Sequence, residues 1–500
     1  MDTKKIMPVL LVCCMTLLAH AQNPVGLFEN ADDVGAVIHK GKTVYDSGSQ
    51  TYRLSGAGGN IWFDKDEFHF AYKKLTGDFI VRTRAKFIGE GIDPHRKLGW
   101  MVRTGLDTGS PMVCATVHGD GLTSFQYRKK HGADAEEIKS PVTGPDIIQL
   151  ERRNGSFLLS VAKYGDPFWT VELPHFEFPE ELFTGLFVCS HNADVIESAD
   201  FENVRIVLPA PKNLVPYKEY IGSHLERMEV ATGKRKILHT STNSIQAPNW
   251  TPNNKSLIYN SEGLIYHYDL ATGKIAQLDT DFVQNNNNDH VLSFDGQMLG
   301  ISSASGEEEY GSLIYTLPVS GGKPKRITST GPSYLHGWSP DGKWLTYTGG
   351  RNNIYDIYKI ASDGSGKEIQ LTNQPTLDDG SEYSPDGKYI YFNSARTGSM
   401  ELWRMKPDGS QQEQLTNDRF QNWFPHISPD GQTLVFLSYA PEVDPGAHPF
   451  YKQVYLRTMP VNGGRIKVVA YLYGGQGTIN VPSWSPDSKH IAFISNTKIE

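Results

Sequence analysis

A short turn motif recurs through the C-terminal half of the chain and constrains the fold more than any other feature. Its clearest copy is Trp-Ser-Pro-Asp-Gly at residues 338–342. Six copies are centred on Thr251, Ser293, Ser339, Ser384, Ser428 and Ser485. Successive copies are 42, 46, 45, 44 and 57 residues apart, and a period of about 40 to 45 residues is typical of four-stranded propeller blades. The spacing therefore predicts a six-bladed β-propeller.

Each copy has the composition of a tight turn between two antiparallel strands. Pro presets one backbone angle of the turn, and Gly tolerates positive φ. The flanking residues 343–347 (Lys-Trp-Leu-Thr-Tyr) and 388–392 (Lys-Tyr-Ile-Tyr-Phe) are rich in strand-forming side chains. A second strand pair follows the turn, as at residues 355–360 and 367–372. One repeat therefore contains the strands of one blade.

The two ends of the repeat region predict how the ring closes. Residues 223–239 resemble the second half of a blade whose first half is missing. The last copy of the motif, at 484–488, is followed by one further strand at residues 490–494. Pairing these segments would complete the sixth blade and leave no open sheet edge at the seam.

Residues 25–208 contain no copy of the motif and are interpreted as a separate domain. Apolar and polar residues alternate over short stretches such as 78–87 and 98–103, with turn residues between them. This pattern is typical of a β-sandwich. A proline-rich segment then predicts a linker over 209–219, and the propeller follows over 220–500. The predicted fold class is all-β throughout.

The N-terminus has the features of a secretory signal peptide. Lys4 and Lys5 precede an apolar run over residues 6–18, and Ala-His-Ala at 19–21 is a small-x-small cleavage pattern. We expect residues 1–21 to be removed and the mature protein to be periplasmic or secreted. The apolar run is shorter than the ~18 residues that a membrane-spanning helix needs, and no other stretch approaches that length.

Charge and motif content exclude several classes of function. The formal net charge is −8 and no basic block is present, which argues against a nucleic-acid partner. The chain lacks a Gly-rich phosphate loop, a Gly-x-Ser-x-Gly elbow and a Cys-x-x-Cys pair, so neither a nucleotide nor an organic cofactor is expected. Cys114 and Cys189 follow the signal peptide, and the sequence leaves open whether they form a disulfide or remain thiols.

The Ser-Pro-Asp-Gly-Lys repeats resemble those of TolB-like propellers and their WD40-like relatives. That superfamily includes scaffolds, peptidase gates and a few polysaccharide lyases, so the resemblance implies the fold more strongly than the function. The N-terminal domain resembles the concanavalin-like jelly rolls attached to carbohydrate-active enzymes, on the order of Gly-Asp-Phe at 77–79, Gly-Leu-Phe-Val at 185–188 and the strand at 201–206. This resemblance implies an oligosaccharide or polysaccharide partner. An envelope protein is the alternative.

Residues shortly before each turn are predicted to line the mouth of the propeller channel. His290 and His336 each lie three residues before their turn, at equivalent positions of adjacent blades. His426 lies two residues before its turn, which places it on the opposite face unless the strand contains a bulge. Imidazole groups around a water-filled mouth are suited to a divalent metal such as Mn or Zn, with Ca as a further candidate.

Oligogalacturonate lyases with a TolB-like propeller resemble this arrangement, because they place histidines and a glutamine around one metal on the propeller axis. The resemblance implies a metal site made by His290, His336, His426 and Gln476. The alternative is that the histidines satisfy backbone groups or bind water. Arg351, Arg396 and Lys452 are candidates for the base that such a lyase needs, on their charge alone.

A neutral sugar would instead call for a pair of carboxyl groups, and Asp379 with Glu382 could serve as catalytic residues. A proline-rich insertion over residues 439–449 lengthens the last repeat, and its His448 could complete a site beside His426. Three classes of function remain open at this point. They are a metal-assisted lyase or hydrolase, a glycan-binding protein without catalysis, and a protein-interaction scaffold.

Overall fold

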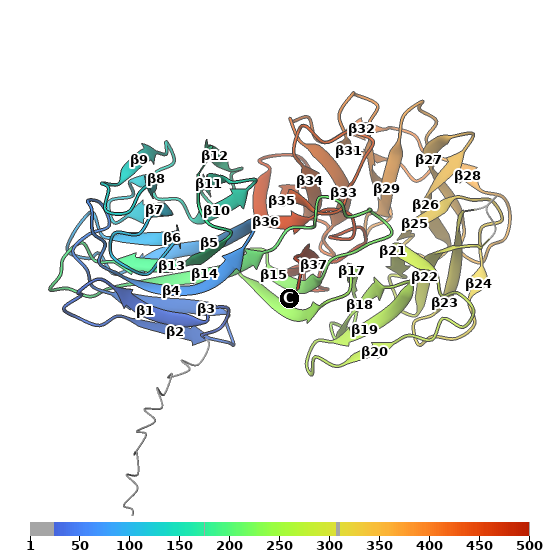
Figure 1. Ribbon diagram of the computed structural model, residues 1–500. Coiled ribbons are helices and arrows are strands. Elements are labelled where there is room, and N and C mark those ends of the chain that lie inside the picture. The colour runs from blue at the N-terminus through green and yellow to red at the C-terminus, as the bar shows by residue number, and fades with distance from the viewer. Residues whose placement is uncertain (1–24, 175, 307–310, 500) are drawn as a thin grey trace, which may run out of the picture.

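The computed structural model describes residues 25–174, 176–306 and 311–499. The predicted signal peptide lies outside this part of the chain. The regular elements described are all β-strands, and among the described residues there is no helix with the length and apolar character to span a membrane. Figure 1 shows two bodies, a sandwich built from the N-terminal strands and a ring of blades built from the C-terminal strands. The predicted all-β class is confirmed.

The N-terminal sandwich consists of two seven-stranded sheets. The first sheet contains, in spatial order, β1 (Asn30–Val34), β4 (Phe68–Thr76), β13 (Glu181–Cys189), β6 (Lys97–Arg103), β7 (Met112–His118), β8 (Thr123–Arg128) and β9 (Glu136–Lys139). The second sheet contains β12 (Trp169–Leu173), β11 (Ser156–Ala162), β10 (Ile147–Arg153), β5 (Phe79–Ile88), β14 (Glu197–Val207), β3 (Thr51–Gly56) and β2 (Lys42–Asp46). Neighbouring strands are antiparallel, as between β13 and β4.

Alternating apolar side chains from both sheets form the core of the sandwich. Trp100 of β6 and Phe79 of β5 are fully buried in one cluster. Trp100 is therefore a core residue that no sugar ring can reach. Cys114 and Cys189 are both buried free thiols, which settles the question that the sequence left open.

The C-terminal strands form a six-bladed propeller. Blade one contains β17 (Gln246–Trp250), β18 (Ser256–Ser261), β19 (Leu264–Asp269) and β20 (Ile275–Gln277), and blade two contains β21 (Asn286–Leu292), β22 (Met298–Ala304), β23 (Ser312–Pro318) and β24 (Lys325–Arg326). Blade three contains β25 (Ser333–Trp338), β26 (Trp344–Arg351), β27 (Ile354–Ala361) and β28 (Ile369–Gln370), and blade four contains β29 (Asp378–Tyr383), β30 (Ile390–Ser394), β31 (Glu401–Met405) and β32 (Glu413–Gln414). Blade five contains β33 (Gln421–Ile427), β34 (Thr433–Tyr439), β35 (Lys452–Pro460) and β36 (Lys467–Gly474).

Blade six joins the two ends of the propeller segment. Its sheet has the order β16 (Arg235–Ser241), β15 (Ser223–Glu229) and β37 (His490–Asn496). Seven residue pairs connect β15 to β37, from Ser223 opposite Asn496 to Glu229 opposite His490. An isolated antiparallel β-bridge between Trp484 and Ile491 pairs the segment before β37 with that strand and forms the inner edge of the blade. The predicted closure of the ring is confirmed.

The turn motif works through one serine and one aspartate. In the third copy, the Ser339 hydroxyl donates to Asp341 Oδ1 at 2.6 Å and accepts from the Trp344 backbone N–H at 2.9 Å. The Lys343 N–H donates to the same aspartate oxygen, and Gly342 has a φ of +72°, which an L side chain adopts only with strain. The motif recurs because each blade needs this turn between its two inner strands.

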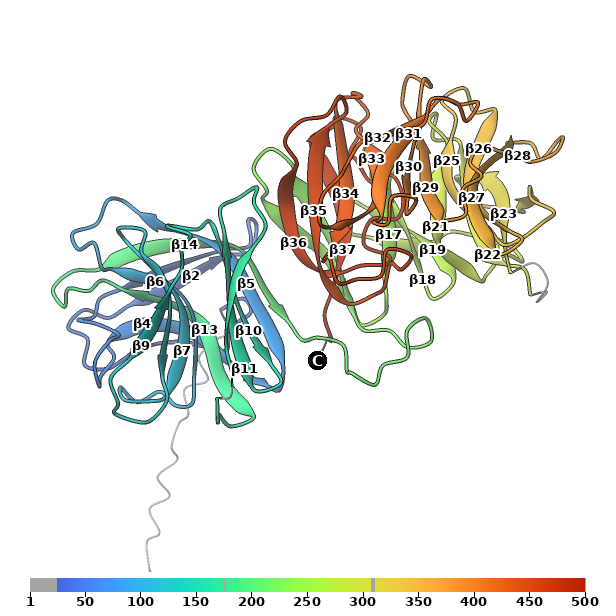
Figure 2. The same cartoon turned by 90° about the horizontal axis from the view of Figure 1, so that it is seen from above.

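The sandwich packs against blades five and six of the propeller (Figure 2). Glu226 of β15 is fully buried between Arg205 of the sandwich strand β14, at 2.6 Å, and Arg235 of β16, at 2.5 Å. Apolar side chains of β10 and β11 form a cluster with Val468 and Tyr471 of β36. The two domains are therefore joined by a buried ionic network and an apolar contact.

Candidate functional site

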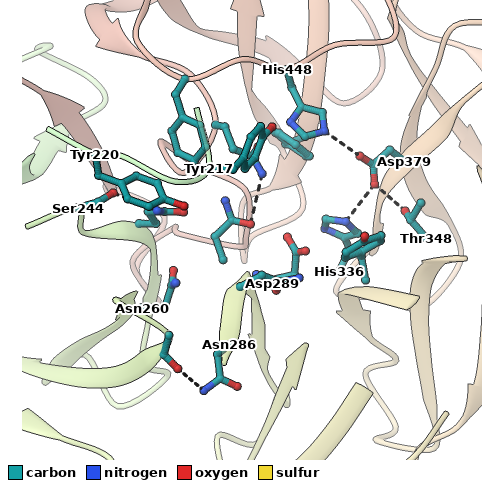
Figure 3. A pocket seen from close by; sticks show the side chains of 18 of the residues that line it. Tyr217, Tyr220, Ser244, Asn260, Asn286, Asp289, His336, Thr348, Asp379 and His448 are labelled. Atoms are coloured by element: carbon teal, nitrogen blue, oxygen red, sulfur yellow. Dashed lines mark hydrogen bonds and ion pairs between the residues drawn. The ribbon is translucent and has the colours of Figure 1, made fainter. Parts of the chain in front are cut away.

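A cavity of about 930 Å³ opens at the mouth of the propeller. Blades one to five, the connections that flank blade six, the interdomain linker and the insertion contribute to its wall, and Figure 3 shows some of these side chains. The aromatic lining residues are Tyr217, Tyr220, Tyr334, Tyr355, Phe424 and Phe450. The amide and hydroxyl lining residues are Thr242, Asn243, Ser244, Gln246, Asn260, Asn286, Asn287, Asn288, Thr348 and Gln476, and the titratable ones are Glu262, Asp289, His336, Asp379 and His448.

Bulges in the innermost strands decide which side chains face this cavity. The pairing register shifts between Asn286 and His290 in β21, between Asp379 and Glu382 in β29, and between Trp423 and His426 in β33. A bulge inserts an unpaired residue and redirects the side chains next to it. Simple counting back from the turn therefore does not identify the lining residues.

Asp379 of β29 lies at the centre of the polar wall. Its Oδ1 accepts from His336 Nε2 at 3.0 Å, from the Thr348 hydroxyl at 2.6 Å and from the Gly380 N–H at 2.8 Å. His448 Nε2 from the insertion lies 4.0 Å from Oδ2. Although burial opposes ionisation, the positive charge and the hydrogen bond of His336 outweigh it and lower the pKa of Asp379 to about 2.

The two histidines beside Asp379 have opposite pKa shifts. Burial acts to lower the pKa of His336, but the charge of Asp379 and its hydrogen bond prevail and raise that pKa above its ordinary value. For His448, burial prevails and lowers the pKa. His336 and Asp379 thus form a buried ion pair, and His448 is a neutral imidazole at neutral pH.

Asp289 of β21 is the second buried carboxyl group of the cavity. Its residue is 6 % exposed, and its side chain points into the cavity beside His336 (Figure 3). Burial raises its pKa to about 7, although the charge of His336 opposes this shift. Within the described ranges, neither a hydrogen bond nor an ion pair to its carboxyl oxygens is found, and its Asn287 contact involves the backbone N–H.

The structure does not bring together the histidines of the predicted metal site. His290 faces away from the cavity, with Nε2 at 3.3 Å from the Ile258 carbonyl oxygen, and burial lowers its pKa to about 4. His426 uses both ring nitrogens, one with Glu382 Oε2 and one with the Ile479 carbonyl oxygen, each at 2.6 Å. Neither residue lines the cavity. The part of the chain that the structure describes holds no group of three or more His, Cys, Asp or Glu side chains placed to bind a metal ion.

The other predicted site residues divide between the cavity and the space between blades. Gln476 lines the cavity, where it donates to Asn288 Oδ1 at 3.4 Å and accepts from Asn480 at 2.8 Å. Glu382, the predicted catalytic partner of Asp379, lies outside the cavity lining and is bound to His426. The buried carboxyl group that shares the cavity with Asp379 is therefore Asp289, and the exposed Glu262 also lines the cavity.

The predicted cationic residues do not reach the cavity. Arg351 is paired with Glu368 at 2.7 Å, and Arg396 is paired with Asp378 at 2.8 Å. Lys452 is exposed on β35. Among the described residues, the cavity lining contains no lysine or arginine.

Sequence reasoning missed the contribution of the linker. Tyr217 lies in the linker and Tyr220 directly after it, and their rings pack against Phe450, which follows the insertion, at centroid distances of 5.1 and 5.6 Å. The sequence signal was the presence of two tyrosines within four residues of the last linker proline. Asp289 and His290 are both among the polar residues expected at the channel mouth before the turn of blade two, and of these two only Asp289 lines the cavity.

Comparisons with known proteins match the propeller. Residues 337–443 match the family model described as the PD40, TolB beta propeller domain. The solved structure of a TolB-type protein from Agrobacterium tumefaciens is 42 % identical, with a TM-score of 0.54, and the match covers 56 % of this chain and all of that one. An oligogalacturonate lyase in complex with manganese is 15 % identical, with a TM-score of 0.39, over 55 % of this chain and 82 % of that one. The concanavalin-like resemblance of the sandwich stays a prediction.

A curated relative establishes the family. The uncharacterized protein Atu1656 of Agrobacterium fabrum is 43 % identical over 280 residues, which are 56 % of this chain and 94 % of the relative. The match thus covers nearly the whole relative. The chain belongs to the TolB β-propeller family.

Proposed function

We propose that the protein binds an oligosaccharide without acidic groups at the mouth of its propeller. The observation that carries this proposal is the composition of the cavity wall, which combines aromatic rings and side-chain amides with no described lysine or arginine. Small-molecule sites commonly pair apolar and aromatic walls with a few polar groups that fix orientation. The predicted export of the chain places such a binding protein in the periplasm or outside the cell.

The aromatic residues offer flat apolar surfaces for sugar rings. Tyr217 is 59 % exposed, Tyr220 is 44 % exposed and Tyr355 is 38 % exposed. Tyrosine presents an apolar ring face with a hydroxyl group that can bond to a neighbouring sugar hydroxyl. Since Tyr217 and Tyr220 both pack on Phe450, their rings are supported in place before a ligand arrives.

The amide side chains supply both donors and acceptors. Each Asn or Gln carries one carbonyl oxygen and one NH₂ group, which match the two roles of a sugar hydroxyl. Asn260 and Asn286, on adjacent blades, each have a buried carbonyl oxygen without a hydrogen-bond partner among the described residues. Because both oxygens are shielded from the cavity, the donors and acceptors offered to a ligand come from the other amide groups of the wall.

An acidic sugar fits this wall poorly. A carboxylate ligand that loses its water needs a cation or several donors in compensation. Glu262, Asp289 and Asp379 would instead face it with negative or potentially negative groups. The wall therefore favours glycans without acidic groups over uronate oligomers, and the geometry gives no support to catalysis by Asp379 with Glu382.

Calorimetric titration of the mature protein tests the proposal. Neutral oligomers of glucose, xylose and mannose should include at least one ligand, and oligogalacturonate should bind more weakly than that ligand. Tyr217→Ala should weaken binding tenfold or more because it removes an exposed ring from the wall. Phe294→Ala is the matched control, since Phe294 is 41 % exposed in a turn outside the cavity lining. Stronger binding of oligogalacturonate, or equal binding by Tyr217→Ala, would contradict the proposal.

A further inference from the structure

Asp289 is a buried carboxyl group that faces the cavity without a counter-ion. Buried polar side chains are nearly always hydrogen-bonded, and a buried carboxyl group without a partner calls for an explanation. The carboxyl groups on nearby strands are satisfied: Asp379 is paired with His336, and Glu382 is paired with His426. Asp289 has neither kind of partner within the described ranges, although it lies in the same wall.

The groups around Asp289 are aromatic and acidic. Tyr217 and Tyr334 line the same cavity as Asp289, and the charge of Asp289 acts on both phenol groups. His336 is the cation in its surroundings, but its Nε2 donates to Asp379. Glu262 adds a further carboxyl group to the cavity wall. The wall around Asp289 thus lacks a free positive charge among the described residues.

Aromatic faces together with a carboxylate are a recognition site for an ammonium group. The ring quadrupole attracts a cation, and burial strengthens that attraction. A carboxylate and an ammonium group form a charge-assisted hydrogen bond that a neutral hydroxyl cannot match. Ionisation of a buried carboxyl group is costly without a partner, which accounts for the raised pKa of Asp289, and a bound cation would supply that partner.

We propose that Asp289 receives the protonated amino group of an amino sugar, so that the glycan bound at the propeller mouth carries free amines. This inference rests on the proposed function, because it names the class of glycan that the same cavity takes. Tyr217 and Tyr334 flank the ammonium group, and the amides of the wall bond to the sugar hydroxyls. N-acetylation removes the charge and with it the interaction with Asp289.

Three oligosaccharides of equal length separate the inference from the proposed function. Calorimetric titration at pH 6.5 compares the tetramer of glucosamine, its N-acetylated form and the tetramer of glucose. The wild-type protein should bind the glucosamine tetramer at least tenfold more tightly than either neutral ligand. Equal binding of all three would overturn the inference and leave the proposed function intact. Failure of all three to bind would overturn the inference, and the proposed function falls with it when the xylose and mannose oligomers also fail to bind.

Substitutions at Asp289 assign the preference to this residue. Asp289→Asn keeps the size and the hydrogen-bonding capacity of the side chain but not its charge, so the glucosamine tetramer should bind no better than the glucose tetramer. Asp289→Glu restores a carboxyl group and should recover part of the preference. Asp281→Asn is the matched control, since Asp281 is exposed and outside the cavity lining. An Asp289→Asn protein that keeps the full preference would overturn the inference, as would a wild-type protein that binds a lysine-containing peptide in place of the glucosamine tetramer.

Discussion

Asp379 and His336 form an ion pair that is almost completely shielded from water. The two residues are 7 % and 4 % exposed, and each shifts the pKa of the other toward the charged form. Loss of one member leaves the other buried without compensation, which typically costs about 3 to 5 kcal/mol. At the residue scale, this pair is the part of the site whose energetics can be tested directly.

Replacing Asp379 by Asn should lower the free energy of unfolding by about 3 kcal/mol near pH 5.5, because the buried imidazolium of His336 loses its counter-ion. Urea denaturation of the purified protein measures this change. Glu262→Gln is the control, since Glu262 is exposed and contacts Asn243, and it should change stability by less than about 0.5 kcal/mol. An equal effect of the two substitutions would show that the pair contributes nothing specific.

The same comparison has a predicted pH dependence. Because folding raises the pKa of His336 above 6.5, its contribution is complete below pH 6.5 and is lost as the pH rises through the raised value. Because folding lowers the pKa of Asp379 from 3.8 to about 2, its contribution is present above pH 3.8 and is lost as the pH falls toward 2. The stability difference between wild type and Asp379→Asn should therefore be largest between about pH 4 and pH 6.5, and denaturation at a series of pH values checks this window.

At the scale of elements, the repeated turn is a unit of stability that each blade carries. The Ser339 hydroxyl group makes two hydrogen bonds that hold the turn between β25 and β26. Its equivalent Ser384 makes the same two bonds in blade four. Both serines are buried and their hydrogen-bond partners are local, so the turn is stabilised without help from other blades.

Ser339→Ala should therefore destabilise the protein by about 1 to 2 kcal/mol, since a typical hydrogen bond contributes about 1 kcal/mol. Ser384→Ala should cost a similar amount, because the geometry of the two turns is the same. Thermal unfolding measures both variants against Ser365→Ala, a change in an exposed turn between β27 and β28. A loss of stability in one of the two variants but not in the other would contradict the equivalence of the turns.

The elements also show where sequence reasoning succeeds and where it stops. The turns, the blade count and the pairing of β15 with β37 follow from local chemistry and from a fixed period, so they could be predicted. The bulges in β21, β29 and β33 depend on pairing with the next strand, and no local sequence feature predicts them. In β21 the irregularity adds two residues between the paired positions of Asn286 and His290, and Asp289 lines the cavity whereas His290 does not. Tyr217 reaches the cavity wall because of the path that the linker takes, and the periodicity of the sequence does not predict that path.

At the scale of the whole molecule, one strand pairing holds the ring closed. Residues 482–500 supply β37 and the inner edge of blade six, and β15 lies between β37 and β16. Without β37, one side of β15 would present unpaired backbone groups, and fully buried side chains such as Leu225 and Met228 would lose their cover.

Deletion of residues 482–500 should accordingly give a protein that aggregates or unfolds cooperatively at a lower temperature, as measured by size-exclusion chromatography and calorimetry. A synthetic peptide with the sequence of residues 482–500 serves as the control, because its addition in trans should restore a monomer of normal stability. A truncated protein that matches the full chain without the peptide would show that the ring does not depend on this closure.

The pairing of β15 with β37 also fixes the order in which the molecule can be completed during synthesis. The ribosome makes β15 and β16 before any of the five complete blades, and it makes β37 after all of them. The first propeller strands therefore have one unpaired edge, on β15, while about 250 further residues are translated. Over that interval the finished sandwich is their folded neighbour, and the buried contact of Arg205 with Glu226 can hold β15 in place before its partner strand exists. The N-terminal domain would in this way act as an intramolecular chaperone for the last blade to close.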